Sequence, residues 1–195
     1  MKKAILTLGL AVCTCLAVVT MPAAAAPHGE GANAAPKPAA AKGASELVLD
    51  QWNDIGRKLT AMAEDFPEDK YEFKPTKEQR TFAAQLIHAA GSMYFFTDVA
   101  DGKKPRYGDD PKRDELKSKA QIVAFVKKCI ADGQAAIKAK GDKGMMEVID
   151  GGNGNMVPVY DLAYGLIEHS GEHYGQLVVY YRVAGLVPPE SRPKK

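Results

Sequence analysis

Hydrophobic residues recur at helical spacing in four separate stretches of the chain. The first stretch runs from Ser45 to about Phe66, and its apolar residues, Trp52 among them, are spaced three or four positions apart. This spacing places apolar side chains on one face of a helix. Ser45 is the expected N-cap of the helix, and Pro67 is expected to end it.

The second and third stretches both begin with a capping signal. When a Ser or Thr is followed three residues later by Gln, the side chain of each residue can accept a hydrogen bond from the backbone N–H of the other. This capping box marks the start of a helix. Large apolar side chains follow each signal at helical spacing. The two capping signals are Thr76 with Gln79 and Ser118 with Gln121, and the helices they predict cover residues 77–100 and 119–138.

The fourth stretch, from Tyr160 to Gly185, is long and largely apolar. Gly185 and the following Pro188-Pro189 are stop signals, so one helix is predicted over the whole stretch. No run of alternating polar and apolar residues predicts a strand. Residues 141–157 are expected to form a loop, and the glycines within them to make a flexible connection rather than a phosphate cradle, because no strand precedes them. The sequence therefore predicts an all-α fold, a four-helix bundle with one core.

The N-terminal part of the chain differs in composition from the rest. Residues 1–26 have the pattern of a secretory signal peptide: Lys2 and Lys3, then an apolar run, then an alanine-rich cleavage zone. Export to the periplasm or the medium is therefore expected, without stable membrane insertion. A retained membrane anchor is the alternative, but the apolar run is short for one. Residues 27–44, rich in Ala, Pro and Gly, are predicted to be a disordered linker before the domain at residues 45–190.

The cysteines do not predict a disulfide bond. Cys13 and Cys15 lie inside the predicted signal peptide, where Val12 is a poor neighbour for lipid attachment at Cys13, although such attachment stays open. Cys129 alone remains after cleavage, and a single cysteine has no partner in its own chain. Its apolar neighbours indicate a small core residue rather than a nucleophile.

The charge of the chain argues against nucleic acid as a partner. The sequence has 26 basic and 24 acidic residues, a formal charge of +2. Two of the basic residues, Lys2 and Lys3, belong to the predicted signal peptide, so the mature chain would carry equal numbers of both signs. No basic stripe with interleaved aromatic residues is present, and nucleic-acid binding therefore has no electrostatic support.

Three of the four histidines lie in predicted helices. His169 and His173 are four residues apart, which places both imidazoles on one face of the fourth helix. His88 lies in the second helix with apolar neighbours, and packed helices are about 8–10 Å apart, so its imidazole can reach the pair. The three histidines are predicted to bind one divalent metal ion: zinc, nickel, copper or iron(II). Three protein ligands leave a coordination position open, which is typical of catalytic sites.

Other interpretations of the same residues stay open. Buried histidines that are hydrogen-bonded to their neighbours would need no metal. Residues 169–173 also match H-x-x-E-H, a zinc-protease motif in which the glutamate, here Glu172, is the general base. That motif needs a downstream glutamate ligand, and only Glu190 follows.

Three glycines in the fourth helix, Gly165, Gly171 and Gly175, each cost about 1 kcal/mol against alanine. The last two lie one turn apart, on the face predicted to be opposite the histidines. Close approach of another helix or of a second subunit would explain them, and so would simple tolerance. A metal-free bundle that binds a partner through this face is a further hypothesis.

The region from Trp52 to Arg192 resembles the DinB/YfiT-like family. The resemblance is most specific in the fourth helix, and it extends to the order and spacing of earlier segments. The matching segments are His88, the run Ser118-Lys119-Ala120-Gln121, the run HSGEHYGQLVVYYRVAGLVPP from His169 to Pro189, and Phe66-Pro67 followed by Tyr71 and Pro75.

The resemblance implies a four-helix bundle that holds a divalent metal, usually nickel or zinc, on His88, His169 and His173. Some relatives transfer small thiols or isomerise maleylpyruvate, and dimers are frequent, so a small-molecule substrate and a homodimer are expected here. The expected export separates this chain from thiol-using relatives, which leaves hydrolytic and transferase chemistry equally open. A non-catalytic metal-binding or sensing bundle is the alternative. Side chains that could assist a metal are Tyr94, Tyr180, Glu168 and Glu172.

Overall fold

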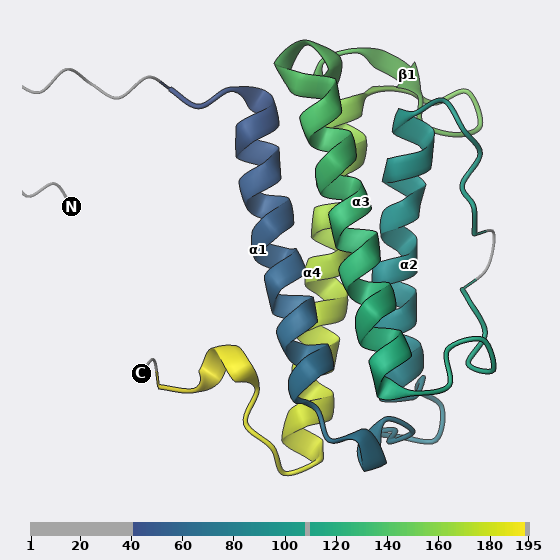
Figure 1. The fold of residues 1–195 in the computed structure, drawn as a ribbon, viewed down its shortest axis with the longest axis vertical. Coiled ribbons are helices and arrows are strands. Elements are labelled where there is room, and N and C mark those ends of the chain that lie inside the picture. Colours follow the sequence, from purple (N-terminus) through teal and green to yellow (C-terminus); the bar gives the residue numbers. More distant parts are fainter. Residues whose placement is uncertain (1–40, 108–109, 194–195) are drawn as a thin grey trace, which may run out of the picture. The chain divides into compact units, whose positions relative to one another are not determined.

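Four long helices lie side by side in Figure 1, which shows a computed structural model of the chain. Helix α1 (Ala44–Asp65) packs against α3 (Lys119–Met145) and α4 (Val159–Val183), and α2 (Phe82–Ala100) packs against the same two helices. α1 and α2 are therefore diagonal to each other across the bundle, as are α3 and α4. The prediction of a four-helix bundle is confirmed.

The structure describes residues 41–107 and 110–193, which belong to one compact unit. The predicted signal peptide, Cys13, and residues 27–40 of the predicted linker lie outside the described residues, and the predictions about them stand as predictions. Within the described part of the chain, no helix combines the length and the hydropathy that crossing a membrane requires.

The connection between α2 and α3, residues 101–118, runs along the length of the bundle. In Figure 1 the chain leaves α2 at the upper end, and its described parts descend beside the bundle to the start of α3 at the lower end. α2 and α3 therefore run in the same direction. α4 returns from the upper end, so the neighbouring helices α2 and α4 are antiparallel. The Tyr180 hydroxyl, late in α4, donates a hydrogen bond of 2.7 Å to the Arg80 carbonyl just before α2. The middle of α2 therefore lies beside the middle of α4.

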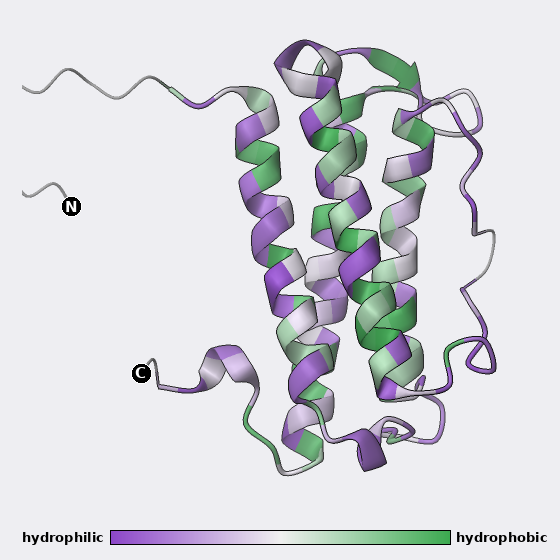
Figure 2. Ribbon diagram, in the orientation of Figure 1, coloured by the Kyte–Doolittle hydropathy of each residue, from purple (hydrophilic) through white to green (hydrophobic). Residues whose placement is uncertain are grey.

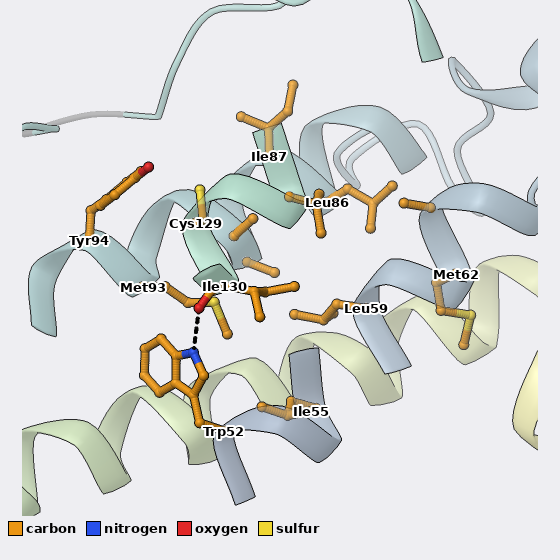
Figure 3. Packing of buried hydrophobic residues seen from close by; sticks show 14 of the residues in the cluster. Trp52, Ile55, Leu59, Met62, Leu86, Ile87, Met93, Tyr94, Cys129 and Ile130 are labelled. Carbon is orange, nitrogen blue, oxygen red and sulfur yellow. Dashed lines mark hydrogen bonds between the residues drawn. The ribbon is translucent and has the colours of Figure 1, made fainter. Parts of the chain in front are cut away.

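The core is built from apolar faces that point between the helices. Figure 2 shows hydrophilic and hydrophobic positions alternating along α1, as expected for a helix with one buried side. Trp52 on α1 is fully buried, and its indole N–H donates to the Ile130 carbonyl on α3 at 3.0 Å (Figure 3). Phe66 stacks on Phe82 with ring centroids 3.7 Å apart, and Tyr181 packs edge-on against Phe66. These contacts join all four helices.

The predicted N-cap of the first helix was wrong. Gly43 occupies the N-cap position of α1 and offers no side chain. The carboxylate of Asp142, on α3, accepts hydrogen bonds from the Ser45 backbone N–H at 2.9 Å and from its hydroxyl at 2.5 Å. A negative charge at a helix N-terminus satisfies free N–H groups and the helix dipole. The cap therefore comes from a residue 97 positions away in the chain.

The second helix begins at Phe82, five residues later than predicted. The Thr81 hydroxyl accepts the backbone N–H of Ala84 at 3.1 Å and caps the helix, whereas Thr76 and Gln79 lie in a turn. Phe82, the first helical residue, is fully buried in the aromatic cluster. The N–H groups of Phe82 and Ala83 donate to the carbonyls of Phe73 and Tyr71, at 3.0 and 2.9 Å, and not to an earlier helical turn.

The third helix begins at its predicted capping box, and Ser118 and Gln121 bond reciprocally. Its end was predicted too early, because helical turns continue to Met145 beyond a kink at Gly141. An antiparallel hairpin of β1 (Val148–Asp150) and β2 (Met156–Pro158) follows and corrects the prediction of a strandless loop.

The Asp150 side chain and two residues in the left-handed conformation fix the hairpin turn. The Asp150 carboxylate accepts the N–H groups of Gly152 and Gly154, and Asn153 and Gly154 both have positive φ angles. Asn-Gly between two apolar runs is a strong hairpin signal. The turn is therefore built by residues that the sequence interpretation assigned to a flexible connection.

The glycines of α4 face open space in this chain. A Cβ added to Gly165, Gly171 or Gly175 would have no neighbour within 4 Å among the described residues. The expected close approach of another helix of this chain was therefore wrong. Approach of a second subunit stays a prediction.

Two glycine-to-alanine variants should change stability in opposite directions. A methyl group at Gly133 would overlap the Trp52 indole, so Gly133→Ala should lower the free energy of unfolding by about 1–3 kcal/mol. Gly175→Ala meets no atom, and should raise it by about 0.5–1 kcal/mol through helix propensity. Urea unfolding followed by circular dichroism measures both. Equal effects of the two substitutions would contradict this packing.

Candidate metal centre

The structure brings the three predicted histidines to one point between α2 and α4. The ring centroid of His88 lies 5.4 Å from that of His169 and 4.6 Å from that of His173, and the two rings on α4 are 4.4 Å apart. One ligand nitrogen from each ring lies within 4.8 Å of the others. The fourth histidine, His28, lies outside the described residues.

This spacing fits one shared ion after small side-chain movements. Three nitrogens at about 2.1 Å from a tetrahedral zinc lie about 3.4 Å apart, so the rings would close by roughly 1 Å. The Nε2 atom of His169 is buried and has no hydrogen-bond partner among the described residues. A buried nitrogen without a partner is costly, and an ion would satisfy it. The residues present therefore fit a divalent metal.

A buried glutamine holds the ring of His173. The amide nitrogen of Gln85 lies 2.5 Å from Nδ1 of His173 and also donates to Oε1 of Gln176 at 2.5 Å. An imidazole that offers Nε2 to an ion carries its proton on Nδ1, and Gln85 must then present its oxygen. A half-turn of the Gln85 amide does this, and a matching half-turn of the Gln176 amide then presents a donor to the Gln85 oxygen. Gln85 is only 2% exposed, so water cannot easily replace it.

A carboxylate holds the ring of His88. Both oxygens of Asp110, in the connection before α3, lie 2.9 Å from Nδ1 of His88. A carboxylate on the outer nitrogen fixes the ring orientation and increases the basicity of the other nitrogen. In both His88 and His173 the Nδ1 atoms are engaged, and the Nε2 atoms remain for an ion.

The protonation of the α4 histidines suits metal binding. Burial lowers the pKa of His169 below its ordinary value, and the positive charge of protonated His88 would lower it further. Burial, followed by the influence of His169 and His88, lowers the pKa of His173 to about 4. Both rings are therefore neutral at pH 7. Neutral imidazole is the form that binds a metal, so no proton must be displaced from these two rings.

An open pocket of about 540 Å³ reaches the site from solvent. His88 and His169 contribute to its wall, and the buried His173 lies behind them. Pockets that bind small molecules have volumes of about 300–1,000 Å³. The other residues lining the pocket are Arg80, Gly91, Ser92, Phe95, Tyr107, Asp110, Gly165 and Leu166.

An ion pair holds the connection that supplies Asp110 and Tyr107. The Arg106 guanidinium binds the buried Asp98 carboxylate, with its closest contact at 2.5 Å, and lies 3.7 Å from the Tyr94 ring centroid. This guanidinium also holds the pKa of Asp98 below its usual range. Tyr107 packs on Tyr94 with centroids 5.6 Å apart. The buried Asp98 carboxylate on α2 therefore holds the segment that forms this part of the pocket wall.

Both tyrosines suggested as helpers are engaged elsewhere. The Tyr94 hydroxyl donates to Asp132 at 2.7 Å, and the Tyr180 hydroxyl donates to the Arg80 carbonyl. Glu168 and Glu172 are exposed on α4. None of the four lines the pocket.

The zinc-protease interpretation is not supported, and Cys129 is a core residue as expected. The one downstream glutamate, Glu190, pairs with Arg57 at 2.6 Å instead of approaching the histidines. Burial raises the pKa of the Cys129 thiol to about 12, so it is not a thiolate at neutral pH.

Three residues at the site, Gln85, Asp110 and Arg80, were not predicted from the sequence. Gln85 lies three residues before His88, so helical spacing could have placed both on one face. Asp110 lies in an irregular segment, and no local pattern indicates its contact with a histidine 22 residues away. Arg80 falls in the region that was wrongly assigned to the second helix.

Comparison with known proteins agrees with the fold. A sequence profile of the DinB superfamily matches residues 23–177. The chain belongs to the DinB superfamily. The profile begins before α1, within the predicted signal peptide and linker. No curated protein sequence gave a significant match.

Two solved structures of DinB-like proteins resemble the bundle. The first, from Bacillus cereus ATCC 10987, has a TM-score of 0.62 and 20% sequence identity over 74% of this chain and 95% of its own. The second, from Bacillus subtilis, has a TM-score of 0.61 and 18% identity over 76% of this chain and 99% of its own. At this identity the likeness establishes the fold alone.

Loss of the Gln85 side-chain amide should weaken metal binding. Gln85→Leu removes the group that orients His173, and outer-shell losses of this kind typically cost about 10–100-fold in metal affinity. Gln85→Glu, whose carboxylate can accept a hydrogen bond from Nδ1–H of His173, should retain most of the affinity. Competition with a zinc chelator measures the dissociation constants. The matched control is Gln134→Leu, because Gln134 bonds Asn53 away from the site. Wild-type affinity in Gln85→Leu would contradict this role.

The metal-free protein should lose stability as the pH falls through the acid range. His173 has a pKa of about 4 in the folded chain against an ordinary value of 6.5, so the unfolded chain binds more protons between these values. The free energy of unfolding should therefore fall by about 1–3 kcal/mol from pH 6.5 to pH 4 on account of this residue. Urea unfolding in EDTA measures it, with His173→Gln as the variant that lacks this titration. An equally steep fall in both proteins would refute the assignment.

Proposed function

We propose that this chain is a metal-dependent enzyme that acts on a small molecule by hydrolytic or transferase chemistry. His88, His169 and His173 are the proposed ligands of one divalent ion, zinc or nickel in the first place and iron as a third option. The observation that carries the proposal is the convergence of three imidazoles from two helices beside an open pocket. A structural metal would be enclosed by four protein ligands, whereas this site offers three.

A divalent ion held there would supply Lewis acidity and lower the pKa of water in an open coordination position. The chain prepares the site in three ways. Asp110 and Gln85 hold the outer nitrogens of His88 and His173, which fixes the direction of the inner nitrogens. Burial keeps the α4 rings neutral. Phe95 and Tyr107 contribute aromatic surface to the lining of the pocket.

The proposal includes the setting in which the enzyme acts. The signal-like residues 1–26 support an enzyme that works outside the cytoplasm. The reaction would then not depend on a cosubstrate thiol that the cytoplasm keeps reduced. A homodimer is part of the same proposal, and the open glycine face of α4 leaves room for a second subunit.

Metal content tests the proposal directly. Mature protein purified without a histidine tag should contain one divalent ion per chain, and alanine at His88, His169 or His173 should lower the affinity more than about 100-fold, beyond the loss typical of outer-shell partners. His28→Ala is the matched control and should bind metal as the wild type does. Elemental analysis and chelator competition give these values.

Two outcomes would count against the proposed enzyme. Full metal binding after substitution of two of the three histidines would contradict the site. Tight binding at the three histidines, without chelator-sensitive turnover across broad substrate panels, would favour a non-catalytic metal-binding or sensing bundle.

A further inference from the structure

The pocket beside the histidines is a trough that runs along α2 and α4. On α2, His88, Ser92 and Phe95 are spaced four and three residues apart and therefore share one face. Because each helical residue rises 1.5 Å, Phe95 lies about 10 Å along the axis from His88. Arg80 lies on the other side of His88, before the start of α2. The trough therefore has a cationic end and an aromatic end, with the histidines between them.

Arg80 has no electrostatic partner in the described part of the chain. It makes no ion pair and no side-chain hydrogen bond there, although its backbone carbonyl is fixed to α4 by Tyr180. It directly precedes the N-cap Thr81, and the first turn of α2 contains no acidic residue. A positive charge near a helix N-terminus is unfavourable, because the helix dipole is positive at that end. Arg80 and the N-terminus of α2 therefore lack a negatively charged partner.

Arg80 is close enough to the histidines for its charge to reach them. Its side chain lines the same pocket as His88 and His169. Asp110 is the one acidic residue that lines the trough, and its carboxylate is bound to His88, whereas the exposed Glu168 and Glu172 do not line it. The proposed divalent ion would add two positive charges. The trough is therefore suited to a negatively charged guest.

The opposite end of the trough is open and apolar. Leu166 and Phe95 line this end. The space beside Gly165 is empty, since a Cβ added there would meet no atom within 4 Å. Phe95 is 38% exposed, which is unusual for a residue on an otherwise well-buried helix. An apolar body bound there would cover this ring.

We propose that the substrate is an amphipathic organic carboxylate, whose carboxylate binds Arg80 and whose hydrocarbon or aromatic body lies toward Gly165 and Phe95. The inference rests on the proposed function, because it names the substrate class of the same pocket. The bond that reacts would lie between the two anchors, beside the histidines. Arg80 is a binding residue in this account, and Gly165 provides space.

The test compares 3-phenylpropionate with its neutral isostere, 3-phenylpropanamide, by calorimetric titration of the zinc-loaded protein. The wild type should bind the acid about tenfold more tightly or better, as expected for a charge-assisted hydrogen bond. Arg80→Gln should abolish this preference, and Arg80→Lys should retain part of it. Gly165→Leu, which fills the apolar end, should weaken the acid and the amide equally. Arg182→Gln and Gly175→Leu, both at exposed positions of α4, should change neither affinity.

Equal affinity of the wild type for acid and amide would overturn the inference. So would a preference that persists in Arg80→Gln, because the metal rather than Arg80 would then select the carboxylate. Zinc content is measured on every sample, so a protein that binds no zinc counts against the proposed function. In that case the same titration of the metal-free protein still decides the role of Arg80.

Discussion

The register between α2 and α4 decides whether side chains from both helices can meet at one point. Two antiparallel helices can shift relative to each other by one turn, about 5.4 Å. The side chains of a site shared between them would then no longer meet. Polar contacts fix the register at two levels. Tyr180 binds the Arg80 carbonyl at the start of α2, and Gln176 binds Gln85 one turn further on. His88, His169 and His173 converge because these contacts hold.

The polar groups at this interface are costly to bury, and the rest of the bundle offsets that cost. α1 and α3 pack against the other sides of α2 and α4 and contribute apolar surface, with Trp52 hydrogen-bonded across to Ile130. The long connection between α2 and α3 is also required, since it supplies Asp110 to His88. The buried Asp98, bound by Arg106, holds that connection against α2. Fold and site therefore depend on the same few polar contacts within an otherwise apolar core.

Sequence periodicity was sufficient for the bundle and for the three histidines, because both follow from spacing within single helices. The i, i+4 pair of His169 and His173 needs only one helix, and His88 needs only a buried face on another. Features that depend on tertiary contacts were missed. Asp142 caps α1 from a distant helix, and the first N–H groups of α2 bond to the carbonyls of Tyr71 and Phe73 in the preceding loop. Asp110 reaches His88 from an irregular segment, which no periodicity describes. The Asn153-Gly154 hairpin signal, by contrast, was present in the sequence and was overlooked.

The central claim is that one ion sits on imidazole nitrogens from both α2 and α4. X-ray absorption spectroscopy at the edge of the bound metal tests it most directly, because imidazole rings give a characteristic multiple-scattering pattern. The account predicts three imidazole nitrogens at about 2.0–2.1 Å, together with at least one further light atom from solvent. His88→Ala should remove one of the three. A first shell of water oxygens without imidazole scattering, or a shell unchanged in His88→Ala, would contradict the account.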